Sequence, residues 1–316
     1  MTTWGISATI KAPVDEILRF AAYHLEKGAH RLFIYLDDDN PSAFAALQAH
    51  PKIRVTTCDD AWWQKRRKNR PETHQARQTA NATHAYRRRA EVDWLIHMDV
   101  DEFLVCDEAI DGILAGLPAD TAMTRIRPME ALSGEALSGG TSAFKRFIPG
   151  GPNRDRIVAT LYPTYGLYTK GGFLSHLAGK VFVRTGMPDI TIKIHNAFQN
   201  GEQIKGIDNQ PGIDLAHVHA KTWEGWQSSY RYRLTKGSYR AELGPNKPHE
   251  KGGLSMHQLF TMIEDEGGKA GLRAFFDEVC ADTPSLRSRL QAHGLLSEVN
   301  LALDAALSTH FPYVNT

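Results

Sequence analysis

The chain has 316 residues, and its 37 Lys plus Arg against 36 Asp plus Glu give a formal net charge of +1. Hydrophobic residues make up 42% and charged residues 23%, which is ordinary for a globular protein and excludes a disordered, collagen-like or coiled-coil chain. The balanced charge also argues against an electrostatic nucleic-acid binder, because neutralising phosphates requires a clear excess of cations.

The cysteines and the apolar segments indicate the compartment. Cys58, Cys106 and Cys280 are far apart and none has a CxxC partner, which favours a reducing compartment and no thiolate zinc site. The first residues lack the basic and apolar regions of a signal peptide, and no stretch reaches the roughly 18 apolar residues of a spanning helix. We therefore expect a cytoplasmic protein.

The first third of the chain alternates strand and helix patterns. Short apolar, β-branched runs predict strands, whereas apolar residues at helical spacing between a starting Pro13 and a closing Gly28 predict a helix. The expected order is strand 4–10, helix 13–28, strand 31–36, helix 42–48, strand 53–57, helix 72–90 and strand 94–98. Such repetition implies right-handed crossovers and a mostly parallel α/β sheet with helices on both faces.

After residue 121, the composition and the pattern of predicted elements change. Residues 122–127 predict another strand, and residues 133–175 are rich in Gly, Ser, Pro and aromatic residues. The strands 180–184 and 190–194 are expected to form a hairpin, followed by a short strand at 215–219. From residue 255 onward, apolar residues at helical spacing, Val299 among them, predict a C-terminal helical region.

The strongest chemical signal is the segment Trp94-Leu95-Ile96-His97-Met98-Asp99-Val100-Asp101-Glu102-Phe103-Leu104. Asp99 and Asp101 lie on the same side of the strand end, and crowded carboxylates are costly unless a cation neutralises them. Mg²⁺ or Mn²⁺ suits oxygen ligands and clamps a diphosphate. The simpler alternative is that these acids only begin the next loop or helix.

These residues carry a resemblance to a known family. The acidic segment resembles the metal-binding motif of family-2-like glycosyltransferases with the A-type nucleotide-sugar fold, in particular the bacterial branch whose strand ends in Asp-x-Asp-Glu-Phe. Several segments near the start of the chain are also similar to that branch, as are Gln78 and Asn81 in the helix before the acidic strand. The opening segments are Ile10-Lys11-Ala12-Pro13-Val14-Asp15-Glu16-Ile17-Leu18, Tyr23-His24, Gly28 and Ile34-Tyr35-Leu36-Asp37-Asp38.

The resemblance implies a nucleoside-diphosphate sugar donor, usually of the uridine type, a divalent Mn²⁺ or Mg²⁺ ion and a saccharide or glycan acceptor. It implies a nucleotide-sugar-binding α/β half at residues 1–127 and an acceptor-side half of the same catalytic domain at 128–240. The C-terminal helical region would cover 241–316. Two alternatives stay open, namely a non-catalytic nucleotide-sugar-binding module and a metal-dependent nucleotidyltransferase.

The resemblance also assigns roles at the predicted donor site. Asp99 would lie near the ribose or sugar and contribute to the metal site, and Asp101 would bind the metal. Asp37 or Asp38 would face the base or ribose. The remaining donor-binding candidates are Lys11 on the nucleotide rim, Gln78 and Asn81. The alternatives are turn chemistry for the aspartates and solvated polar positions for the others.

A second group of candidates follows later in the chain. In Leu215-Ala216-His217-Val218-His219-Ala220-Lys221-Thr222-Trp223, His217 fits the branch's histidine, followed four residues later by Lys221. This resemblance implies His217 as a metal ligand, with Lys221 and Lys180 near the donor diphosphate. The alternatives are structural histidines and solvated lysines at a strand edge.

The catalytic base and the basic runs are less clearly marked. Glu130 follows the strand 122–127, and a carboxylate of this kind is typical of the base that deprotonates an acceptor hydroxyl. Lys65-Arg66-Arg67-Lys68 and Arg87-Arg88-Arg89 are compatible with peripheral contact to the inner face of a membrane, or with solvated helix ends.

Overall fold

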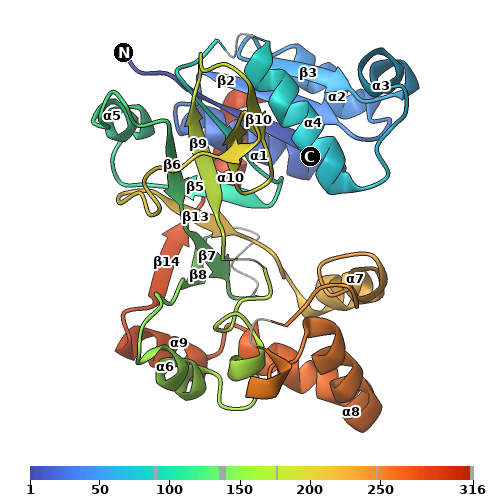
Figure 1. The fold of residues 1–316 in the computed structure, drawn as a ribbon, viewed down its shortest axis with the longest axis vertical. Coiled ribbons are helices and arrows are strands. Elements are labelled where there is room, and N and C mark those ends of the chain that lie inside the picture. Colours follow the sequence, from blue (N-terminus) through green and yellow to red (C-terminus); the bar gives the residue numbers. More distant parts are fainter. Residues whose placement is uncertain (89–90, 135–139, 176, 246–247, 314–316) are drawn as a thin grey trace. The chain divides into compact units, whose positions relative to one another are not determined.

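The computed structural model describes residues 1–88, 91–134, 140–175, 177–245 and 248–313 (Figure 1). Arg89 of the second basic run lies outside them. The chain divides into two compact units, and each unit is formed by segments that are not consecutive in the sequence. The first unit comprises Met1–Pro128, Ala178–Leu215 and Ala302–Thr316, and the second comprises Met129–Leu177 and Ala216–Leu301. The chain thus first changes unit next to the expected boundary at 127, whereas the region 241–316 is shared between both units.

The first unit is built on a six-stranded sheet with the order β3-β2-β1-β4-β9-β6. Its strands are β1 (Trp4–Ile10), β2 (Arg31–Leu36), β3 (Ile53–Thr57), β4 (Trp94–His97), β6 (Met123–Ile126) and β9 (Lys180–Arg184). The first four of these strands are parallel, as the sequence predicts. They are parallel because helical segments connect them, which brings each strand back to the sheet in the same direction.

The helices of the first unit are α1 (Val14–Glu26), α2 (Pro41–Gln48), α3 (Asp60–Arg67), α4 (His74–Arg87), α5 (Ile110–Ala115) and α10 (Leu303–His310). They include the three that the alternating pattern predicts, as α1, α2 and α4, and two that it does not, as α3 and α5. Side chains of Asn40, Asp59 and Thr73 accept the backbone N–H bonds that begin α2, α3 and α4. Helix α3 is not among the expected elements, because its polar and basic sequence carries little apolar periodicity.

The other half of the sheet corrects the expectation of a mostly parallel arrangement. Strand β9 pairs antiparallel with β4 on one side and with β6 on the other, so the fold is a mixed α/β fold. The expected hairpin is also wrong, because β10 (Ile190–Ile192) pairs with β11 (Ala197–Gln199) in a separate sheet that ends in β12 (Glu202–Gln203). Both edges of β9 are already occupied, which leaves no edge for β10.

The crossovers set which helix covers which face of the parallel strands. The chain moves from β1 outward to β2 and β3, then returns through α4 to β4 on the opposite side of β1. Right-handed crossovers in opposite directions place α4 on the face opposite α1. Helix α4 packs there with Ala82, Ala85 and Tyr86 against Tyr35 and Leu95 of the sheet.

The second unit contains a small antiparallel sheet and a helical part. Strand β8 (Thr141–Arg146) pairs with β7 (Pro128–Ala131) and with β14 (Leu296–Asn300). The helices are α6 (Arg154–Leu161), α7 (Trp223–Thr235), α8 (Met256–Val279) and α9 (Pro284–Ala292). Val299 is therefore in a strand and not in the predicted helix, because β8 offers residues 296–300 a complete ladder partner.

Aromatic side chains dominate the core of the second unit. Trp226 of α7 lies 5.7 Å from Phe260 and 5.8 Å from Phe276 of α8, measured between ring centroids. Large aromatic rings bury much apolar surface, which anchors these helices to each other. In the described part of the chain, no helix combines the length and the apolar character needed to cross a membrane.

Candidate functional site

The carboxyl ends of β1, β2 and β4 form the edge at which the predicted site residues of the first unit gather. Strand β1 is the switch point, because the chain leaves it toward β2 and returns on its other side at β4. The backbone continues this register beyond the strands, since Asp37 N donates to Ile10 O at 2.8 Å and Met98 N donates to Ser7 O at 3.1 Å. Sheets of this topology bind ligands at such a point.

Asp99, directly after β4, is held by a buried lysine. Lys180 Nζ lies 2.6 Å from Asp99 Oδ2 and 3.1 Å from Glu102 Oε2, and the side chains of Lys180 and Glu102 are fully buried. Gln78 of α4 donates from Nε2 to the other oxygen, Asp99 Oδ1. Burial alone would lower the pKa of Lys180, but the charges of Asp99 and Glu102 raise it above its ordinary value.

Gly179 and His195 position Lys180 at the start of β9. Gly179 has φ of +65°, and a Cβ there would lie 1.9 Å from Ile126 O, so the strands approach more closely than any side chain permits. His195 Nδ1 donates to Gly179 O at 3.0 Å. Burial, then the charge of Lys180, lowers the pKa of His195 to about 3, so its imidazole is neutral at pH 7.

Several buried polar atoms at the same edge have no hydrogen-bond partner among the described residues. They are both ring nitrogens of His97, Oγ of Ser7 and Oδ1 of Asp38. Ser7 and His97 are paired in the register of β1 and β4, and burial lowers the pKa of His97 to about 3. Unsatisfied buried polar atoms are rare in proteins, so this edge of the sheet places several unusual polar groups next to Asp99 and Lys180.

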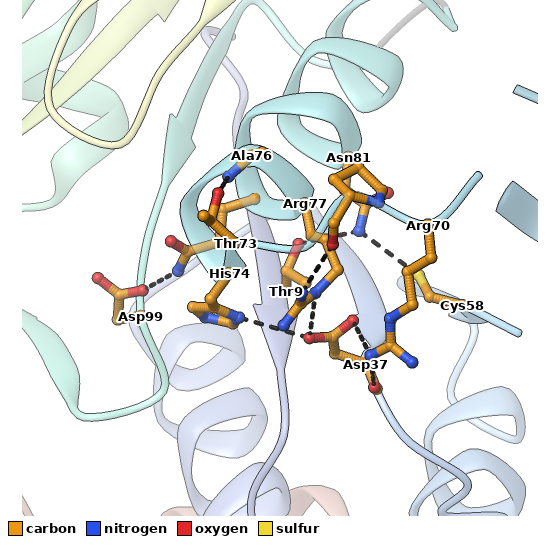
Figure 2. Close-up of polar contacts among 12 residues, drawn as sticks. Thr9, Asp37, Cys58, Arg70, Thr73, His74, Ala76, Arg77, Asn81 and Asp99 are labelled. Atoms are coloured by element: carbon orange, nitrogen blue, oxygen red, sulfur yellow. Dashed lines mark hydrogen bonds and ion pairs between the residues drawn. The ribbon is translucent and has the colours of Figure 1, made fainter. Parts of the chain in front are cut away.

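Asp37, which follows β2, is buried and surrounded by basic side chains (Figure 2). Arg70 Nη2 lies 2.9 Å from Oδ1, Arg77 Nε lies 2.8 Å from Oδ2, and His74 Nδ1 lies 3.4 Å from Oδ2. Burial alone would raise the pKa of Asp37, but hydrogen bonds from His74 and Arg77, with the charges of Arg77 and Arg70, bring it below its ordinary value. Asp37 therefore stays ionised and fixes three basic side chains at the amino end of α4.

Gln78 and Asn81 lie one turn apart on α4 but have different partners. Gln78 holds Asp99, as described above. Asn81 donates from Nδ2 to Thr9 Oγ1 at 3.1 Å and to Cys58 Sγ at 3.4 Å, and Trp62 Nε1 donates to its Oδ1 at 3.3 Å. Asn81 thus ties α4 to the sheet and to α3, while Lys11 at the end of β1 is exposed.

Glu130 of the second unit lacks the properties of a general base. It is buried, forms an ion pair with Lys145 at 3.0 Å and accepts backbone bonds from Leu174 at 3.1 Å and Ser175 at 2.8 Å. Burial alone would raise its pKa, but the charge of Lys145, then that of His219 and the bonds from Ser175, lower it to about 2. A carboxylate of this kind binds a proton too weakly to take one from a hydroxyl group near pH 7.

Of the predicted metal ligands, Asp101 lies in the first unit, whereas His217 lies in the second unit together with His219. His217 ends β13 (Asp214–His217) and is 7% exposed, with its ring centroid 5.2 Å from that of His219. Arg233 Nη1 lies 3.0 Å from His219 Nε2, so His219 is also bound to a guanidinium. Lys221 is exposed in the loop before α7, and its carbonyl accepts from Ser133 Oγ at 2.8 Å.

Several residues of the site are absent from the sequence-based assignment. Arg70, His74 and Arg77 around Asp37 are the clearest cases, together with the buried His97 and His195 beside Lys180. A signal did exist, because a cluster of basic residues at a helix start faces an aspartate that ends the neighbouring strand. It is interpretable only after the strand order is known.

Neither a known protein family nor a curated protein matches this sequence. Among solved structures, the chain is similar to a mycobacterial protein at 13% identity with a TM-score of 0.29, covering 58% of this chain and 53% of that one. It is also similar to HddC from Yersinia pseudotuberculosis at 11% identity with a TM-score of 0.27, covering 69% and 77%. The chain therefore spans about half the length of the mycobacterial protein.

Proposed function

We propose that this protein is a metal-dependent glycosyltransferase with an A-type nucleotide-sugar fold. It would transfer a sugar from a nucleoside-diphosphate sugar of the uridine type to a hydroxyl group of a glycan or other saccharide. The observation that carries the proposal is the group of ionised side chains at the β1 switch point. Asp37 after β2 and Asp99 after β4 are both held there by basic or amide side chains.

The residues at this edge suit the two parts of a nucleotide. The unsatisfied atoms of His97 and Asp38 supply bonds of the kind that a base or ribose requires. Arg70 and His74 keep 42% and 41% of their side chains exposed and lie at the amino end of α4, where the helix dipole also favours an anion. Lys180 positions Asp99 and Glu102, because its ammonium group forms ion pairs with both carboxylates.

The proposed cation ligands are the two residues that the resemblance implies, Asp101 and His217, and His219 is a further candidate because it alternates with His217 in the sequence. A set that combines a carboxylate with imidazole nitrogens fits Mn²⁺ better than Mg²⁺, which prefers oxygen ligands throughout. When bound, the ion would supply positive charge for the departing nucleoside diphosphate. Asp99, whose two oxygens are held by Gln78 and Lys180, is assigned here to the ribose or sugar.

The first prediction tests the cation assignment. Asp101→Asn removes a charged metal ligand without changing the core. Mn²⁺-dependent binding of uridine diphosphate should therefore weaken by more than about tenfold, because substituting even the residues that hold metal ligands in place typically costs that much metal affinity. Isothermal titration calorimetry with and without Mn²⁺ measures this. The matched control is Asp107→Asn, an exposed aspartate of the same segment, which should bind as the original protein does.

The reaction itself is tested by its products. Incubation with uridine-diphosphate sugars, Mn²⁺ and a panel of saccharide acceptors should release uridine diphosphate, detected by anion-exchange chromatography. Release of sugar 1-phosphate, the group displaced when the nucleotidyl moiety is transferred, would instead identify a nucleotidyltransferase. Donor binding with no product across the panel would identify a binding module. Full activity of Asp101→Asn, or full activity in excess chelator, would contradict the metal-dependent mechanism.

A further inference from the structure

The second unit contains a cavity that none of the roles above uses. Its volume is 390 Å³, within the range of about 300–1,000 Å³ that is usual for small-ligand sites. It lies between α6, the 3-10 turn Gly166–Tyr168 and the segment that follows β8. The residues that matter most in its lining are Arg154, Lys170, Ile148, Val158, Leu167 and Thr169.

The polar part of this cavity is cationic. Arg154 and Lys170 both line it, and the acidic residue in the lining is Asp155. Asp155 is largely exposed, with 59% of its side chain accessible, and lies 3.9 Å from Arg154 Nη1. Lys170 is partly buried, and no hydrogen-bond acceptor or ion-pair partner contacts its ammonium group among the described residues. Burial lowers the pKa of Lys170, partly opposed by the charge of Glu130.

The other part of the cavity is apolar, and two glycines, Gly166 and Gly171, have close neighbours beside it. Ile148 and Val158 belong to the aromatic and aliphatic core of this unit, whereas Leu167 at the cavity is 46% exposed. A Cβ on Gly166 would lie 2.7 Å from Tyr162 Cβ, and a Cβ on Gly171 would lie 2.9 Å from Arg154 Nη2. The absence of these atoms lets the turn pack closely and lets the guanidinium lie against the backbone.

We propose that this cavity binds the anionic group of a small, sugar-sized molecule, with Arg154 and Lys170 as its charged contacts. The apolar wall of Ile148, Val158 and Leu167 would contact the carbon body of the ligand. The shared chemistry is a carboxylate or phosphate on a saccharide. If the proposed glycosyltransferase function holds, on which this assignment rests, the ligand is an acidic saccharide that accepts the transferred sugar.

A purely structural role explains Lys170 poorly. Lysine is rarely buried unless it is paired, because removing an ammonium group from water is costly. Lys145 of the same unit obeys this rule through Glu130 and two carbonyl groups, at 3.0, 2.5 and 2.6 Å. Lys170 beside the cavity lacks such partners among the described residues, and an anionic ligand would supply one.

The test measures binding directly, with neither donor nor Mn²⁺ present, so that its outcome is independent of glycosyl transfer. Glucuronate, glucose 6-phosphate and glucose are titrated into the ¹⁵N-labelled protein at constant ionic strength, and the chemical shifts of the cavity residues are followed. At least one of the two anions should bind saturably, and glucose should bind at least tenfold more weakly. Which anion binds distinguishes a carboxylate from a phosphate ligand.

Three variants connect the binding to the cavity. Lys170→Met and Arg154→Gln should each weaken anion binding by at least about tenfold, as expected for loss of a charge-assisted hydrogen bond. Lys170→Met should keep or raise the melting temperature, because it removes a poorly paired ammonium group. The matched control is Arg156→Gln on the exposed side of α6, which should leave the affinity unchanged.

The result that would overturn the proposal is equally specific. Binding of neither anion, equal binding of glucose, or equal losses in Arg156→Gln and the cavity variants would each exclude a built anion site. Because the measurement needs no transfer activity, anion binding with no transfer would refute the proposed function alone. Transfer activity with no anion binding would refute the cavity proposal alone.

Discussion

The ion pair between Glu130 and Lys145 shows how a residue suited to catalysis in sequence becomes structural in its environment. The Glu130 carboxylate accepts two backbone N–H groups, and Lys145 donates to two carbonyl groups and faces Glu130. A buried pair with all its polar atoms satisfied stabilises one particular packing, and removing one partner leaves the other uncompensated. Glu130 therefore supports the packing of the second unit, and we assign it no role in the proposed reaction.

The prediction at this scale concerns Glu130→Gln. It should lower the free energy of unfolding by about 3 kcal/mol at pH 7, the usual cost of leaving a buried charge unpaired. The folded-state pKa of Glu130, about 2, is below its ordinary value of 4.5, so its stabilisation is fully present above pH 4.5 and is lost as the pH falls toward 2. The difference between variant and original should therefore stay constant from pH 8 to 5 and shrink below pH 4.5.

Urea unfolding across this pH range measures the effect. Glu224→Gln, an exposed position on α7, is the control and should change stability by less than about 0.5 kcal/mol. An unchanged stability combined with a large loss of transfer rate would restore Glu130 as a catalytic base.

Among the strands and helices, β9 has the largest effect on the architecture, because it makes the sheet of the first unit mixed. It brings Lys180 to the edge of the sheet beside Asp99, although the two residues are 81 positions apart in sequence. Its entry between β4 and β6 requires the close approach at Gly179 that no side chain permits. One glycine thus connects the mixed sheet to the geometry of the candidate site.

Gly179→Ala tests this connection. The new Cβ would meet Ile126 O, so the strands must separate, and we expect a loss of at least about 2 kcal/mol in unfolding free energy, the scale of local backbone strain. Gly186→Ala is the control, because Gly186 also has a positive φ of +86° but open space around its Cβ position. Denaturant unfolding should show the larger loss for Gly179→Ala, and equal losses would mean that the close approach contributes nothing.

At the scale of the whole molecule, the chain returns to the first unit at its C-terminal end. Helix α10 packs on α1, burying Leu307 and Phe311 to 6% exposure each. Arg19 Nε also lies 2.8 Å from Asp304 Oδ1, at a more exposed position. The first unit is therefore completed only when the last described helix is in place.

Removing residues 302–316 should destabilise the first unit by about 3–5 kcal/mol, the transfer free energy of two large apolar side chains. The control is Asp304→Asn, which removes only the exposed ion pair and should cost less than about 1 kcal/mol. Thermal unfolding followed by circular dichroism compares the two. A shortened chain as stable as the original would show that α10 packs without contributing to the fold.

The sequence by itself determined the parallel half of the sheet and the acidic residues that end its strands. Strand β1, helix α1 and strand β2 fall where apolar periodicity and the flanking Pro13 and Gly28 predict them. These signals are readable because they depend on neighbouring residues alone. The polar residues after β2 and β4 are equally local, since a strand that ends must deliver its next residues to the sheet edge.

Only the tertiary structure decided the partners of those residues. The pairing of Asp37 with Arg70 and Arg77, the burial of Lys180 beside Asp99 and the insertion of β9 join segments that are distant in sequence. Periodicity describes which face of an element is buried, but not which charged group it meets there. The physical reason is that a buried charge is stabilised by whatever opposite charge the completed fold places beside it, and that placement exists only after folding.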